Sequence, residues 1–238
     1  MKLLYEGKAK RLYETERPDE LLMEFKDDAT AFNGEKKAQF ENKGRMNQAL
    51  SLLLMQLLEK GGVPTHFVRT IDEIRTIVKA VEIIKVEVVV RNVAAGSLCN
   101  RTWFKEGEAL KAPVVEYFLK DDDLGDPMIN DDHIRELNLA TLHELAFLKS
   151  EALKINDILK PFFLKTGLKL VDFKLEFGRL STDPSTIILA DEISPDTCRL
   201  WDVSTGEKMD KDRFRRDLGN VMESYAEVLK RAEDAVHS

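Results

Sequence analysis

Two acidic residues in the last third of the chain have the types and the spacing of a cation-binding pair. Residues 169–180 alternate apolar and charged side chains, which gives a β-strand one apolar and one polar face. A turn signal at Asp183-Pro184 follows, and residues 187–191 are rich in β-branched and apolar residues, so we predict a hairpin. A hairpin that turns between Asp183 and Pro184 places Glu176 opposite Asp191. Like charges directly opposite each other on adjacent strands repel, so we expect a positive charge between Glu176 and Asp191.

Paired carboxylates offer the oxygen ligands that Mg²⁺ prefers when phosphate oxygens complete its coordination. The alternative is an exposed sheet face on which Lys174 neutralises its acidic neighbours, because structural ion networks imitate functional sites. The run DEISPDTCRLWD at residues 191–202 favours a site, since it is rich in ionisable and hydroxyl-bearing residues. Pro195 prevents the strand from continuing there, so we expect a polar loop.

A short basic segment near the N-terminus has the chemistry of a phosphate contact. It reads Gly7-Lys8-Ala9-Lys10 and separates β-compatible segments at residues 3–5 and 11–14. Lysines two positions apart share one face, and glycine lets backbone N–H groups approach a ligand closely. The segment matches neither GxxxxGK[ST] nor GxGxxG, so a solvated turn is the alternative interpretation.

A second basic residue stands at the end of a predicted buried strand. Val86, Val88 and Val90 lie on one side of that strand, which ends in RNVAAGS at residues 91–97. The guanidinium of Arg91 matches a carboxylate or phosphate, and the small residues before Ser97 permit a close approach. A simple ion pair between Arg91 and a surface acid is the alternative.

These residues need a mixed framework of strands and helices. A third strand at residues 21–25 would complete an N-terminal antiparallel meander, and residues 118–130 are expected to form a long acidic loop. Predicted helices span residues 35–60, 131–138, 141–165 and 211–232. Thr141 and Glu144 have capping-box spacing, and Pro161 predicts an end or a kink in the helix that contains it.

Composition excludes several classes of protein. The 238 residues carry a net charge of −7, which argues against a general nucleic-acid binder, so we expect small-molecule partners. Cys99 and Cys198 form no CxxC pattern, and the four histidines have no metal-ligand spacing. Charges within residues 1–10 argue against a signal peptide, and the most apolar helical stretch, residues 49–58, is far shorter than the roughly 20 residues that cross a bilayer. We therefore expect a cytoplasmic protein without a membrane partner.

Seven segments of the chain together resemble a known family. They are GKAK at residues 7–10, ATAFNGEKK at 29–37, VVVRNVAAGSL at 88–98, FLKDDDLGDPMIN at 118–130, VDFKLEFG at 171–178, LADEISPDTCRLWD at 189–202 and KMDKDRFR at 208–215. In this order they resemble the SAICAR synthetases, the phosphoribosylaminoimidazole-succinocarboxamide synthases of purine biosynthesis. The resemblance covers almost the whole chain.

The resemblance implies an ATP-dependent ligase. Such an enzyme joins the carboxylate of carboxyaminoimidazole ribonucleotide (CAIR) to the amino group of L-aspartate and gives SAICAR, ADP and phosphate, through an acyl phosphate. It also implies an α+β fold with two lobes and ATP in the cleft between them. Residues 1–90 would form a small antiparallel β lobe similar to the nucleotide-binding lobe of protein kinases, and residues 91–238 a larger α/β lobe that carries the hairpin and the substrate site.

The resemblance also implies roles for individual residues. ATP would be bound by Gly7, Lys8, Ala9, Lys10, Glu87, Val89, Lys120, Glu176 and Asp191. Glu176 and Asp191 would hold Mg²⁺. The substrate-binding residues would be Arg91, Ser97, Asp196, Arg199, Lys211 and Arg215, and the catalytic residues Asp172 and Lys174. Asn33 stands where some relatives carry aspartate, which puts a metal role there in doubt. Similar proteins are commonly homodimers, so we expect one here.

Two other classes of function stay open. A small-molecule kinase could use the same cleft, and it would consume ATP without L-aspartate. A regulatory nucleotide-binding module would show no turnover, but a metal-linked acidic pair is not needed for sensing alone.

Overall fold

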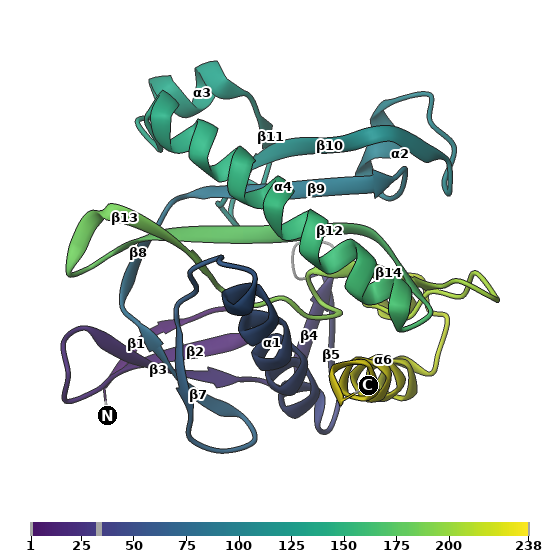
Figure 1. Cartoon of the computed structure of the whole chain (residues 1–238), viewed down its shortest axis with the longest axis horizontal. Helices are drawn as coiled ribbons and strands as arrows, with labels where there is room; N and C mark the ends of the chain where they lie inside the picture. Colours follow the sequence, from purple (N-terminus) through teal and green to yellow (C-terminus); the bar gives the residue numbers. More distant parts are fainter. Residues whose placement is uncertain (1, 32–34, 238) are drawn as a thin grey trace.

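The computed structural model describes residues 2–31 and 35–237, and it consists of antiparallel sheets covered by helices (Figure 1). Asn33 lies outside these residues. The mixed α+β class predicted from the sequence is confirmed, whereas the division into lobes at residue 90 stays a prediction. In the described part of the chain, no helix combines the length and the apolar character that crossing a membrane requires.

The first sheet contains the N-terminal strands. Its order is β1 (Leu3–Glu6), β2 (Lys10–Glu14), β3 (Glu20–Phe25), β7 (Arg75–Lys79) and β6 (Phe67–Thr70). All neighbouring pairs are antiparallel, which confirms the predicted meander of the first three strands. Helix α1 (Lys43–Lys60) packs against β3 and beside the C-terminal helix (Figure 1).

Helix α1 begins later than its periodicity predicted. Residues 36–39 do not start the helix, because β5 (Lys36–Gln39) pairs with β4 (Asp28–Ala31) as a two-stranded sheet. Ala38 of β5 pairs with the buried Ala29 of β4, so backbone pairing with β4 takes the place of the first turns of the predicted helix. The left-handed backbone of Asn42, with φ of 67°, then separates the strand from the helix.

The second sheet is built around one long strand. Its strands are β8 (Val81–Ile83), β9 (Val86–Val93), β10 (Ala109–Leu119), β11 (Met128–Ile129), β12 (Leu168–Leu180), β13 (Asp183–Ala190) and β14 (Cys198–Asp202). Their order is β11-β10-β9-β12-β13, with β8 and β14 also paired to β12. Helix α4 (Leu142–Lys165) crosses β9, β10 and β12 and buries Leu148, Ile155 and Phe163 against them (Figure 1).

The hairpin of β12 and β13 has a different register from the one predicted. Glu176 pairs with Ala190, not with Asp191. Leu180 pairs with Asp183, so the turn closes two residues earlier than the Asp183-Pro184 signal suggested, and an irregularity before Ile187 takes up the extra residues. Asp191 therefore follows the end of β13, where its φ of 60° turns the chain.

The remaining helices occur near their predicted positions, but several of their ends differ from the prediction. The capping box of Thr141 and Glu144 is confirmed, α3 covers Asp131–Glu136, and Pro161 lies inside α4 without ending it. The predicted helix at residues 211–232 is instead a short α5 (Asp212–Arg215) and a separate α6 (Val221–His237). The backbone is left-handed at Asp217, Gly219 and Asn220, and it therefore separates α5 from α6. A short α2 (Ser97–Arg101) follows β9.

Candidate active site

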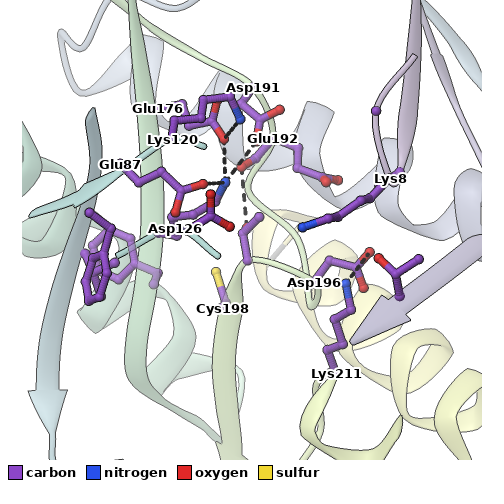
Figure 2. Close-up of a pocket in the computed structure, with 18 of the residues that line it drawn as sticks. Lys8, Glu87, Lys120, Asp126, Glu176, Asp191, Glu192, Asp196, Cys198 and Lys211 are labelled. Carbon is purple, nitrogen blue, oxygen red and sulfur yellow. Dashed lines mark hydrogen bonds and ion pairs between the residues drawn. The ribbon is translucent and has the colours of Figure 1, made fainter. Parts of the chain in front are cut away.

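A cavity of about 410 Å³ is bordered by residues of both large sheets and of the α5 segment. Every predicted site residue except Ser97 borders it: Gly7, Lys8, Ala9, Lys10, Glu87, Val89, Arg91, Lys120, Asp172, Lys174, Glu176, Asp191, Asp196, Arg199, Lys211 and Arg215. Figure 2 shows Glu176, Lys120, Asp191 and Glu192 gathered at one end of this pocket, with Asp196 and Lys211 at the other. Residues from distant parts of the chain thus meet in one pocket.

At the first end of the pocket, Glu176 and Asp191 are bridged by a lysine. The ammonium group of Lys174 makes a short contact with Glu176 Oε1 and lies 3.8 Å from Asp191 Oδ2. Lys120 Nζ donates to the same oxygen of Glu176 at 2.8 Å. A positive charge does lie between the two acids as expected, even though they are not cross-strand partners. Lys174 also binds Glu87 at 2.8 Å, so it neutralises several acids together.

Lys10 reaches this cluster from the first sheet. Its ammonium group makes a short contact with Asp191 Oδ1 and lies 3.2 Å from Glu192 Oε1. Burial disfavours the charged form of Lys10, but Asp191 and Glu192 outweigh burial and raise the pKa of its ammonium group. Burial likewise opposes ionisation of Asp191, and Lys10, Lys174 and Lys120 together lower the pKa of that carboxyl group. The ion pair of Lys10 and Asp191 therefore keeps both of these groups charged at neutral pH.

The charges and atoms of this cluster suit a divalent cation. Glu87, Glu176, Asp191 and Glu192 outnumber Lys10, Lys120 and Lys174 by one charge. Among residues 2–31 and 35–237, no three His, Cys, Asp or Glu side chains form a ligand set, but one or two carboxylates suffice for Mg²⁺ when phosphate and water complete its shell. Oε2 of Glu192 is buried without a hydrogen-bond partner in the described structure. The residues present therefore fit the ion.

An arginine cluster also borders the pocket. Arg91 is 3% exposed and donates to Glu116 Oε2 at 2.7 Å and to Asp172 Oδ2 at 2.6 Å. Its partners are buried acids, so the alternative of a surface ion pair is wrong. Ser97 is not among the described residues that border the cavity, and its hydroxyl accepts a hydrogen bond from Arg91 Nη2 at 3.1 Å.

Arg199 extends the arginine cluster from β14, because Asp172 on β12 pairs with Arg91 of β9 on one side and with Arg199 on the other. It donates to Asp172 Oδ2 and to Asp212 Oδ2, at 2.9 Å in each case. A Cβ atom on Gly96 would lie 2.5 Å from Nη2 of Arg199, so only glycine lets the backbone approach this closely. Two guanidinium groups that share Asp172 form a preorganised site for an anionic ligand.

The far end of the pocket is held by buried charges. Asp196 accepts from Lys43 Nζ at 2.5 Å and from the Tyr225 hydroxyl at 2.7 Å, while Lys211 Nζ lies 3.8 Å from its Oδ2. Burial lowers the pKa of the Lys211 ammonium group more than Asp196 restores it. Arg215 donates to Asp212 at 2.7 Å beside them. These groups present positive charge to the cavity.

Sequence reasoning missed several residues that border the cavity. They are Tyr5, Thr30, Ala31, Phe118, Asp122, Asp126, Phe173, Glu192, Thr197 and Cys198. Thr30, Asp122 and Glu192 lie inside the segments at residues 29–37, 118–130 and 189–202, so the polar residues of these segments are the sequence signal that points to them. Asp122 also joins the two sheets across the pocket, because Lys8 Nζ lies 2.7 Å from its Oδ1.

An antiparallel α+β protein with a lysine-and-carboxylate cluster beside paired arginines belongs to the class of proteins that handle phosphorylated small molecules. The family model described as SAICAR synthetase matches residues 3–232. The phosphoribosylaminoimidazole-succinocarboxamide synthase of Akkermansia muciniphila is 62% identical over 98% of this chain and 99% of its own length. The chain belongs to the SAICAR synthetase family.

Solved structures agree with this assignment. A crystal structure of phosphoribosylaminoimidazole-succinocarboxamide synthase from Ehrlichia chaffeensis has a TM-score of 0.95 and 46% identity, and the match covers 98% of each chain. A SAICAR synthetase (Type-2) in complex with ADP has a TM-score of 0.93 and 48% identity, with 97% of each chain covered.

Proposed function

We propose that this protein is an ATP-dependent ligase that joins the carboxylate of CAIR to the amino group of L-aspartate, with release of ADP and phosphate. One observation carries the proposal: the lysine-and-carboxylate cluster and the arginine cluster border the same cavity. The first suits the phosphates of a nucleotide, and the second suits the phosphate or carboxylate of CAIR. Family membership and the ADP complex of a relative support the same reaction.

The nucleotide would lie between the first sheet and the hairpin. Lys8, Lys10 and Lys120 supply ammonium groups for its phosphates, and the backbone around Gly7 permits close approach. Glu87 and Val89 on β9 would meet the adenine ring. Glu176 and Asp191 would hold Mg²⁺, which, when bound, supplies charge neutralisation at the phosphoryl oxygens.

CAIR would lie against the arginine cluster. Arg91 and Arg199 would bind its phosphate or carboxylate, and Ser97 would hold Arg91 in position through their hydrogen bond. Asp172 accepts hydrogen bonds from both arginines, so its first task is to orient their guanidinium groups. Positioning of this kind lowers the barrier by fixing the reacting groups in line.

The reaction would proceed in two displacements. A carboxylate oxygen of CAIR attacks the γ-phosphorus of ATP, a P–O bond forms, and the bond to the leaving ADP breaks. The amine of L-aspartate then attacks the acyl carbon, a C–N bond forms, phosphate leaves, and the amine loses a proton. Lys174, which bridges Glu87 and Glu176, would place its positive charge beside the phosphoryl group during transfer.

L-aspartate would enter at the far end of the pocket. Lys211 and Arg215 would bind its carboxylates, and Asp196 would fix Lys211 and attract the substrate's ammonium group. This assignment rests on the positive charge that these groups present to the cavity.

One assay tests the reaction class. ADP release is measured in the presence of CAIR and Mg²⁺, with and without L-aspartate. We expect sustained ADP release that requires both substrates. Sustained release without L-aspartate would instead identify a small-molecule kinase, and nucleotide binding without turnover would identify a regulatory module.

We also propose that the protein is cytoplasmic and forms a homodimer. Light scattering, which measures the mass of the particle, tests the homodimer.

A further inference from the structure

Asp212 joins two arginines that the proposed function assigns to different substrates. Its Oδ2 accepts a hydrogen bond from Nε of Arg199 at 2.9 Å, and its Oδ1 accepts one from Nη1 of Arg215 at 2.7 Å. Arg199 is proposed to bind CAIR, and Arg215 is proposed to bind L-aspartate. Each oxygen of one carboxylate therefore holds the guanidinium group of a different substrate site.

Asp212 itself is separated from the ligands. It is 1% exposed and is not among the described residues that border the cavity, whereas Arg199 and Arg215 both border it. Burial opposes ionisation of Asp212, but the two arginines outweigh burial and lower the pKa of its carboxyl group. Asp212 is therefore a buried charge that can act on the ligands through the arginines and not by direct contact.

Backbone contacts fix the position of this carboxylate. Asp210, which is fully buried, accepts a hydrogen bond from the Asp212 N–H at 2.7 Å and one from the Leu200 N–H at 2.8 Å. Leu200 follows Arg199 in β14, and Asp212 begins α5. Asp210 therefore ties the strand that carries Arg199 to the segment that carries Asp212 and Arg215.

Arg215 depends on Asp212 more than Arg199 does. Among the described residues, the guanidinium group of Arg215 donates only to Asp212, whereas that of Arg199 also donates to Asp172. The Arg215 side chain is 30% exposed, so without Asp212 it would sample several rotamers. An arginine that is already held in one geometry loses less conformational entropy when it binds a carboxylate.

We propose that Asp212 is a positioning residue that holds Arg199 and Arg215 in their ligand-binding geometries and so connects the CAIR site to the L-aspartate site. The inference rests on the proposed function for the identity of the two ligands. An asparagine in this place could accept from one guanidinium group, but its amide NH2 group would face the other, so at most one arginine would stay in position. Loss of Asp212 should therefore weaken both substrates, whereas loss of either arginine should weaken chiefly one.

Steady-state kinetics of Asp212→Asn test the proposal. We expect the KM values for CAIR and for L-aspartate each to rise by on the order of tenfold, because both guanidinium groups lose their alignment. The KM for ATP should stay within about threefold, since Asp212 shares no partner with the lysine cluster. An unchanged KM for CAIR or for L-aspartate would overturn the proposal, and so would an equal rise for ATP.

Asp202→Asn is the matched control. Asp202 is also a buried acid, at the end of β14, and it accepts from Nη1 of Arg231 at 2.8 Å, but neither residue is among the described residues that border the cavity. This variant should melt at a lower temperature and keep its KM values. A rise in the KM values of Asp202→Asn like that of Asp212→Asn would show that lost stability causes the effect, and it would overturn the proposal.

A double variant shows whether Asp212 acts on CAIR through Arg199. Titration calorimetry with CAIR needs neither turnover nor L-aspartate. In the Arg199→Ala background, Asp212→Asn should weaken CAIR binding no further, because the guanidinium group that Asp212 holds is already absent. Additive losses would overturn the proposal, since Asp212 would then act on CAIR by another route.

Asp212→Glu provides a second test if Asp212→Asn does not fold. It keeps the charge and can still bind both guanidinium groups, but from a shifted position. The KM values for CAIR and L-aspartate should again rise together, each by about threefold or more. KM values equal to those of the unaltered protein would overturn the proposal. Failure of the proposed reaction appears separately, as ADP release by the unaltered protein that does not depend on L-aspartate.

Discussion

Nζ of Lys43 lies 2.5 Å from Oδ2 of Asp196, and the two side chains are 1% and 4% exposed. This buried pair connects the first turn of α1 to the loop after β13. The Tyr225 hydroxyl of α6 donates to the other oxygen of Asp196 at 2.7 Å. Two helices therefore hold the loop that carries Asp191 and Glu192, so the shape of the pocket depends on side chains of α1 and α6.

Lys43→Met should destabilise the protein strongly. It leaves Asp196 buried with less compensating charge, and removal of one partner from a buried pair costs about 3–5 kcal/mol. Urea unfolding followed by circular dichroism measures the change. Lys2→Met, at an ion pair whose side chains are 72% and 52% exposed, is the control and should change stability by less than about 0.5 kcal/mol. A similar loss in both variants would contradict the role of the buried pair.

Glu176→Gln should remove most turnover while the fold persists. Lys174 keeps Glu87 and Asp191 as partners, so the variant should retain its folded structure. Loss of a charged ligand at the phosphoryl group should lower kcat by on the order of 10²-fold or more. The checks are ADP release and a thermal melt. Glu82→Gln, whose side chain is 79% exposed, should have nearly unaltered kcat. Activity close to that of the unaltered protein in Glu176→Gln would remove the metal assignment.

Arg199→Ala should chiefly weaken CAIR binding. The variant deletes a charged hydrogen-bond donor and releases Asp172 and Asp212, so affinity should fall by about 10- to 100-fold. Titration calorimetry with CAIR measures this directly. The affinity for ADP should stay within about threefold, since Arg199 binds Asp172 and Asp212 and shares neither acid with the lysine cluster. Arg231→Ala, which removes a partner of Asp202 and Glu227 outside the cavity, is the control. Unchanged CAIR affinity in Arg199→Ala would reject the assignment.

Stability should fall in acid through His66, which is 5% exposed beside Asp191, Lys10 and Lys79. Burial lowers the pKa of its imidazole from 6.5 to about 4. The pKa of His66 is lower in the folded protein than in the unfolded chain, so protonation of His66 favours the unfolded chain. The contribution of neutral His66 to the free energy of unfolding is therefore complete above pH 6.5 and is lost as the pH falls towards 4. The loss amounts to about 3 kcal/mol.

Urea unfolding at several values between pH 8 and pH 4 measures this effect. His66→Gln cannot take up the proton, so the difference between its curve and that of the unaltered protein isolates the histidine from the acids that titrate in the same range. Parallel curves for the two proteins would show that His66 does not contribute.

Local features of the fold could be predicted from short stretches of sequence. The alternation in residues 169–180 predicted β12, and the spacing of Thr141 and Glu144 predicted the start of α4. Both depend on backbone periods and caps that neighbouring residues determine. Motifs in order along the chain likewise indicated the family, and almost all the site residues that they implied border one cavity.

The sequence by itself determined which residue types were available and which backbone periods they favour. Only the tertiary structure decided that Glu176 faces Ala190, that residues 36–39 form a strand, and that Lys10 reaches Asp191 from a position 181 residues away. The register of a hairpin depends on how its turn closes, and ion pairs depend on which charges packing brings together. These choices depend on how turns close and on which side chains pack together, and the periodicity of a single segment does not specify either.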